Sequence, residues 1–150
     1  MGDRRQAREL ALQALFFLDM DKSDSGRNPG QNPGQNTARN IEAFCCNNED
    51  KLTKGVESFF RVLINGVVEN KTRIDDLLNK SSKNWKISRM SVVDRNIMRI
   101  AIYEFLECDD IPDSVTINEA VEIGKKYGSK DSGSFINGVL DKIKSLESPK

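Results

Sequence analysis

The opening segment of the chain combines positive charge with an aromatic ring. Arg4, Arg5 and Arg8 precede Phe16 in an amphipathic stretch. On a helix of about 3.6 residues per turn, all four fall on one side together with Leu12. Guanidinium groups bind phosphates and an exposed ring stacks on an unpaired base, which is the chemistry of single-stranded RNA recognition. Packing of Leu12 and Phe16 under another helix or a loop accounts for the same pattern, and periodicity leaves both interpretations open.

The residue inventory removes most catalytic chemistry. The chain has no histidine, which excludes Ser–His and Cys–His nucleophiles and any histidine-containing zinc site. Cys45, Cys46 and Cys108 lack the spacing of a metal site or a disulfide framework, so free thiols are expected. The carboxylates of Asp75 and Asp76 diverge on a helix and indicate surface charges or turn residues. We therefore expect no enzyme, no metal site and no cofactor.

Length and charge exclude further classes of protein. The 150 residues fit one domain, and 23 basic residues balance 23 acidic ones, so the chain is not a grossly basic nucleic-acid coat. No apolar run is long enough for a membrane span and no signal-peptide pattern is present, so a cytoplasmic location without membrane association is expected. The charges are nevertheless uneven: residues 80–99 hold six basic residues and one acid, whereas residues 104–122 hold seven acids and no basic residue.

Most of the chain has apolar residues at helical spacing, so helices must position these residues. The pattern predicts an all-α bundle with helices over 3–18, 51–79, 91–108, 114–127 and 134–146, of which the second is one helix or two with a possible break at Gly66. The helix over 91–108, capped by Ser91, is apolar on most sides and should be central, with Glu104 a buried carboxylate in a structural ion pair. Gly128 is expected to end the next helix as a left-handed residue.

One segment lacks the apolar residues that a packed element needs. Residues 19–36 are rich in Asn, Gly, Pro and Gln and contain a tandem Asn-Pro-Gly-Gln. Such a composition buries too little surface to offset the entropy lost on ordering. We expect a flexible, disordered loop inside a single domain spanning residues 1–150.

Two blocks of sequence resemble the NusB family. Residues 4–16 (RRQARELALQALF) match the family's basic-basic-x-Ala-Arg-Glu followed by Gln-Ala-Leu-aromatic. The second block runs from 94–104 (DRNIMRIAIYE) through 117–122 (INEAVE) to 131–142 (DSGSFINGVLDK). The resemblance covers almost all of the chain except residues 19 to about 50, and the two distant blocks agree in order and spacing.

The resemblance implies both a fold and a function. NusB proteins are small all-helical RNA-binding factors of bacteria, which implies a bundle of about six to seven helices in two packed subdomains. They bind the boxA element of nascent single-stranded RNA together with a small-subunit ribosomal protein known as NusE. The complex joins an antitermination assembly on RNA polymerase, notably during ribosomal RNA transcription. By elimination, the long middle helix and residues 80–89 are where we expect the ribosomal protein to bind.

The resemblance also implies roles for residues of the first helix. Arg4, Arg5 and Arg8 are implied to contact phosphates. Phe16 stands where the family often has Tyr, so it is implied to stack on a base without the hydrogen bond of a hydroxyl group. The loop over 19–36 departs from the family, whose connection usually forms a helix.

The last helix and the turn before it are the second implied contact. Asp131 and Ser132 are implied to read a base edge, since a carboxylate accepts hydrogen bonds from the Watson–Crick edge of an unpaired guanine. Phe135 is implied to stack, although its position on the helix is nearly as consistent with the core.

Two alternatives to an RNA-binding antitermination factor remain. A protein-only helical adaptor would use the acidic residues 104–122 to dock a basic partner. A NusB-like RNA-targeting domain also occurs in some RNA cytosine methyltransferases. However, no Gly-rich cofactor loop and no catalytic Pro-Cys follow in this sequence.

Overall fold

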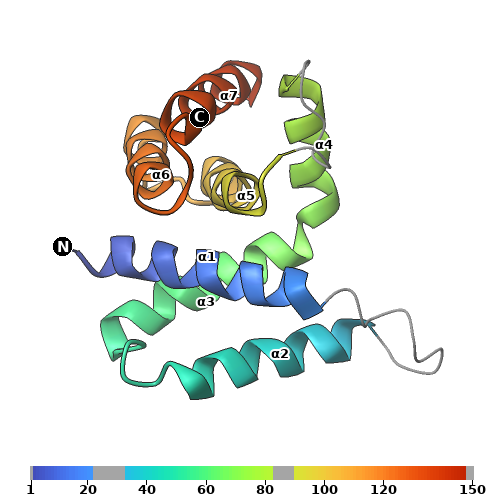
Figure 1. Ribbon diagram of the computed structural model, residues 1–150, viewed down its shortest axis with the longest axis vertical. Coiled ribbons are helices and arrows are strands. Elements are labelled where there is room, and N and C mark those ends of the chain that lie inside the picture. Colours follow the sequence, from blue (N-terminus) through green and yellow to red (C-terminus); the bar gives the residue numbers. More distant parts are fainter. Residues whose placement is uncertain (1, 22–32, 83–89, 148–150) are drawn as a thin grey trace. The chain divides into compact units, whose positions relative to one another are not determined.

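The computed structural model describes residues 2–21, 33–82 and 90–147. Within these ranges every regular element is an α-helix, as Figure 1 shows. The seven helices of the described chain are α1 (Asp3–Asp21), α2 (Pro33–Asn47), α3 (Lys54–Glu69), α4 (Lys71–Ser81), α5 (Val92–Glu107), α6 (Asp113–Tyr127) and α7 (Ser132–Glu147). The expected all-α fold of six to seven helices is confirmed.

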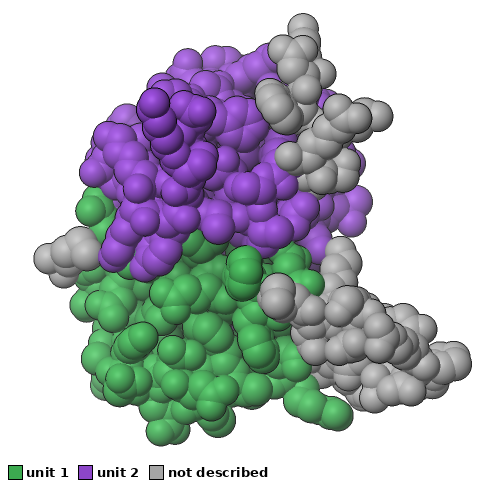
Figure 2. Space-filling view, viewed as in Figure 1, with its two compact units in different colours: residues 1–62 green, residues 63–150 purple. Residues whose placement is uncertain are grey.

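The chain divides into two compact units, residues 1–62 and residues 63–150 (Figure 2). Unit 1 contains α1, α2 and the first part of α3, whereas unit 2 contains the rest of α3 and the helices α4 to α7. None of the described helices is long and apolar enough to cross a membrane.

An aromatic stack connects the three helices of unit 1. The ring centroids of Phe44 in α2 and Phe60 in α3 are 5.8 Å apart, and the Phe17 ring of α1 lies 6.5 Å from that of Phe44. Such offset and tilted pairs add to the energy of apolar burial. Phe17 is nevertheless 38% exposed, so the other side chains of unit 1 cover its ring only in part.

The segment expected to be a loop is shorter than its composition indicates. α1 continues to Asp21 and α2 begins at Pro33, so both ends of the range 19–36 are helical. Proline is favoured at a first helical position because the N–H that it lacks would have no helical partner there. Residues 22–32 lie outside the described part of the chain, and α2 itself was not predicted.

The long middle pattern forms two helices, but the break is at Asn70 and not at Gly66. The Asn70 side-chain amide donates to the Gly66 carbonyl over 2.8 Å, and its backbone N–H donates to the same oxygen over 3.0 Å. Gly66 stays inside α3, where a Cβ would collide with the ring of Tyr103. The glycine is therefore required for a close approach, not for a break.

α5 is the central helix of unit 2, as its apolar circumference predicted. It contacts α4, α6 and α7, which surround it in Figure 1. Ser91 caps its start, since the Asp94 N–H donates to Ser91 Oγ over 3.0 Å. Glu104 is 1% exposed, so its predicted burial is confirmed, and it accepts a 2.9 Å hydrogen bond from the hydroxyl group of Thr116 in α6.

An ion pair between a buried arginine and a half-buried aspartate joins α4 to α5 and corrects the prediction for Asp75. Arg99 is buried, and its Nε and Nη2 donate to the two carboxylate oxygens of Asp75 over 2.8 and 3.0 Å. The Arg99 Nη1 donates to Asn96 over 2.9 Å. The prediction of a surface charge at Asp75 was therefore wrong, because helical spacing does not reveal a partner on another helix.

Candidate nucleic-acid interface

The start of α1 lies against α3 inside unit 1. The Arg4 Cζ lies 5.2 Å and the Arg8 Cζ 5.4 Å from the centroid of the Phe59 ring of α3. Both distances fall within the range of a cation–π interaction. A Cβ on Gly55, in the first turn of α3, would collide with the Asp3 carboxylate, so the beginnings of α1 and α3 approach closely. The Asp3 carboxylate therefore lies at the start of α3, where the positive end of the helix dipole favours a negative charge.

The residues predicted for the outward face of α1 differ in exposure. Arg4 is exposed, Arg5 is half-buried and Phe16 is 42% exposed. Arg8 is only 4% exposed, so its predicted outward position is wrong, whereas the 4% exposure of Leu12 favours the packing interpretation that periodicity left open. A helical wheel assumes one buried side, whereas α1 contacts α2 and also places Arg8 over Phe59. Arg4, Arg5 and Phe16 form the exposed part, which we call the α1 surface.

A salt-bridge network joins α2 to the part of α3 that carries Phe59. Arg61 donates from Nη1 to Glu42 of α2 and from Nε to Glu57, each over 2.8 Å. The hydrogen bond from Arg61 and its charge lower the pKa of Glu42, and hydrogen bonds to Glu42 and Glu57 raise the pKa of Arg61. Burial raises the pKa of the nearby Cys45 thiol.

The turn between α6 and α7 positions the second group of predicted residues, in unit 2. Asp131 is exposed, and its carbonyl accepts the Phe135 N–H over 3.1 Å. Ser132 is 1% exposed, and its Oγ accepts the Ser129 N–H over 2.8 Å. Phe135 is half-buried in the first turns of α7. Ser132 therefore stabilises the turn, and Asp131 is the polar side chain of this group that reaches the surface.

Gly128 ends α6 by a different mechanism from the expected one. Its φ of −95° and ψ of −162° are extended, so the predicted left-handed conformation is wrong. A Cβ at this position would collide with the Ser132 side chain. The glycine leaves space for Ser132 under the turn, which is a tertiary contact that backbone patterns do not reveal.

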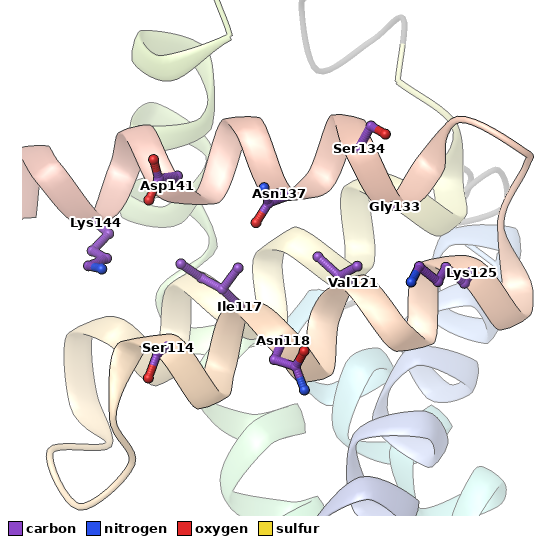
Figure 3. A pocket seen from close by; sticks show the side chains of 10 residues that line it. All are labelled: Ser114, Ile117, Asn118, Val121, Lys125, Gly133, Ser134, Asn137, Asp141 and Lys144. Atoms are coloured by element: carbon purple, nitrogen blue, oxygen red, sulfur yellow. The ribbon is translucent and has the colours of Figure 1, made fainter.

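A groove of about 530 Å³ lies between α6 and α7 beside this turn (Figure 3). Ile117 and Val121 of α6 point toward α7, and Asn137 of α7 points toward α6. Gly133 and Ser134, which lie between the predicted RNA contacts Ser132 and Phe135, also line the groove. The groove therefore offers an amide donor and acceptor above an apolar strip. The groove was not predicted from the sequence, although its lining residues recur at helical spacing.

The two groups of predicted residues belong to different units. The predicted residues of unit 1 are Arg4, Arg5, Arg8 and Phe16, whereas those of unit 2 are Asp131, Ser132 and Phe135. Phe59 was missed because two adjacent phenylalanines in an amphipathic helix are typical of a core. Residues 83–89, part of the range expected to bind a ribosomal protein, lie outside the described residues.

The family model of NusB matches residues 5–145. The chain belongs to the NusB family. Members of this family are transcription antitermination factors and not enzymes, which agrees with the expectation of no catalytic residue. Among the described residues there is also no group of three or more potential metal ligands, and the three cysteines are free.

Relatives of the NusB family match over most of their length. The transcription antitermination protein NusB of Desulforapulum autotrophicum is 53% identical, and the match covers 98% of this chain and 94% of the relative. The protein of the same name from Desulfatibacillum aliphaticivorans is 46% identical, with 95% of this chain and 90% of the relative covered.

Solved structures show the same fold. T. maritima NusB is 37% identical with a TM-score of 0.77, and the match covers 97% of this chain and 93% of that one. A crystal structure of the antitermination factors NusB and NusE in complex with dsRNA contains a chain that is 25% identical with a TM-score of 0.73, where 97% of this chain and 98% of that one are covered.

Proposed function

We propose that this NusB family member binds boxA-type single-stranded RNA together with the ribosomal protein NusE, as part of an antitermination complex on RNA polymerase. In this role it supports ribosomal RNA transcription in the cytoplasm. Family membership supports the proposal, and the likeness to a chain crystallised with NusE and dsRNA supports the parts of it that concern NusE and RNA. The observation that carries it is the exposed combination of cations and an aromatic ring on the α1 surface.

The α1 surface binds the RNA backbone and one base. Arg4 and Arg5 contact phosphates, and Arg8 adds positive charge from beneath because it is almost fully buried. Phe16 stacks on an unpaired base through its exposed face. Base–aromatic stacking contributes about 1–3 kcal/mol per base, enough for one ring to matter.

The turn before α7 reads a base. The exposed Asp131 carboxylate accepts hydrogen bonds from a base edge, Ser132 holds the turn that presents it, and the half-buried Phe135 contacts a base with the exposed part of its ring. Substituting Asp131 with Asn adds a donor, so it should change which base is preferred more than it changes the total affinity.

Fluorescence anisotropy with a boxA-like single strand tests the RNA assignment. Binding should weaken as salt rises, because phosphate contacts release counterions. Arg5→Ala should lower the affinity and reduce the slope against salt, whereas Phe16→Ala should lower the affinity with little change of slope. Arg39→Ala, which removes an exposed arginine of α2, is the matched control. Unchanged affinity in both Arg5→Ala and Phe16→Ala would remove the α1 surface from the interface.

The same strand annealed to its complement tests the preference for unpaired RNA. A duplex hides its base faces, so stacking on Phe16 is lost and weaker binding is expected. Equal binding of the duplex, with no effect of Phe16→Ala, would contradict base stacking.

Titration of the RNA with and without NusE tests coupled assembly. A gain in RNA affinity on adding NusE, and an equal gain in NusE affinity on adding RNA, is expected from linkage. NusE binding that is independent of RNA, in a protein with no RNA affinity, would instead favour the protein-only adaptor.

A further inference from the structure

Two cations from successive turns of α1 converge on one ring of α3. Arg4 and Arg8 are four residues apart, so they lie on the same side of α1. Their guanidinium carbons are 5.2 and 5.4 Å from the centroid of Phe59, a half-buried side chain in the same compact unit. Both contacts are thus internal to unit 1.

The ring offsets two costs of presenting such cations. The guanidinium groups repel each other, and the negative face of the ring attracts both. An arginine side chain also has many rotamers, and fixing it on binding costs entropy. A cation already held over a ring has lost part of that freedom before a ligand arrives.

The two arginines differ in what they can reach. Arg8 is 4% exposed, whereas Arg4 is exposed at the start of the helix. A phosphate in solution therefore meets the Arg4 guanidinium first, and the buried Arg8 adds positive potential close to it.

We propose that Phe59 is a positioning residue of the RNA interface. Its ring holds Arg4 over α3 in the orientation that meets an RNA phosphate, with Arg8 fixed on the same ring. This inference rests on the proposed RNA-binding function, and it adds a residue of α3 that does not itself contact RNA.

Substituting Phe59 with Leu tests the role of the ring, because leucine keeps most of the apolar volume and removes the π face. We expect RNA affinity at low salt to fall about fivefold, the order given by one or two partly exposed cation–π contacts. The slope of log affinity against log salt should become shallower by about 0.7, which corresponds to one phosphate contact with a single strand. Phe59→Tyr keeps an aromatic ring, so its RNA affinity and its salt slope should both equal those of the wild type.

The neighbouring Phe60 supplies a matched control. It is fully buried and stacks on Phe44, so Phe60→Leu removes a ring of the same size from the same helix without touching the arginines. Phe60→Leu should lower Tm at least as much as Phe59→Leu but leave the salt slope unchanged. NMR of the arginine Nε–H groups should show ring-current shifts at Arg4 and Arg8 that disappear in Phe59→Leu.

The outcomes separate this inference from the proposed function. Wild-type binding with a salt slope, combined with unchanged affinity and slope in Phe59→Leu, would overturn the inference alone. An equal loss of affinity and slope in Phe60→Leu would also overturn it, because the effect would then reflect general loss of structure. Absence of salt-dependent RNA binding by the wild-type protein would overturn the proposed function and this inference together.

Discussion

The hydroxyl group of Tyr103 titrates in a partly buried environment on α5. Burial raises the pKa of Tyr103, and the charges of Cys108, Glu107 and Glu69 raise it further. The folded chain thus holds this proton more tightly than the unfolded chain does. The corresponding stability is fully present below the ordinary pKa of 10.0 and is lost as the pH rises through the higher folded value.

Replacing Tyr103 with Phe removes this titration, so the free energy of unfolding should decline less steeply above about pH 10. Urea unfolding at neutral and alkaline pH measures the change. Tyr127→Phe, at the exposed second tyrosine, is the control and should keep the wild-type decline. Identical alkaline declines for Tyr103→Phe and the wild type would show that Tyr103 does not control this loss.

The residue types of the proposed RNA interface could be read from the sequence, but the burial of Arg8 and Ser132 could not. The arginines, Phe16 and Asp131 were predicted from their chemistry and from the family resemblance. The burial of Arg8 depends on the Phe59 ring of another helix, and that of Ser132 depends on the Ser129 N–H across a turn. Contacts of this kind leave no periodic signal in the chain.

At the scale of helices, the start of α5 was predicted correctly. Ser91 caps α5 as expected because the cap involves residues three apart. The break between α3 and α4 was misplaced because Gly66 allows a close approach of the Tyr103 ring. A glycine in a sequence is compatible with a helix break and with a close contact, and the sequence does not distinguish the two. α2 was missed because the low-complexity composition extends into its first turn.

Replacing Gly66 with Ala tests how closely α3 and α5 approach. Alanine favours helix over glycine by about 1 kcal/mol, but its Cβ would collide with the Tyr103 ring. Overpacking typically costs about 1–3 kcal/mol, so net destabilisation is expected in urea unfolding. Combining Gly66→Ala with Tyr103→Ala removes the collision and should leave the alanine at 66 neutral or stabilising relative to Tyr103→Ala alone. Destabilisation of similar size in both backgrounds would contradict the steric explanation.

At the scale of the whole molecule, α3 is shared between the two units. The boundary falls between Val62 and Leu63, inside the continuous helix Lys54–Glu69. Phe60 is fully buried on one side of this boundary and Ile64 on the other. Unravelling α3 would remove core residues from both units, so we expect them to unfold together.

The three free thiols can measure this coupling. Cys46 is exposed and should react with a thiol reagent in the native protein, whereas Cys45 in unit 1 and Cys108 in unit 2 are buried and should be protected. In a Cys46→Ser variant, both remaining thiols should become reactive over the same range of urea concentration. Two separate ranges would show that the units unfold independently.

The glycine at position 66 also limits which substitutions relatives of this protein can accept. The ring of Tyr103 occupies the space that any larger residue at 66 would need. A relative that acquires a bulkier residue at 66 must therefore also have a smaller one at 103. Positions 66 and 103, which are far apart in the chain, should therefore change together among relatives. The smaller residue at 103 should arise before the bulkier residue at 66.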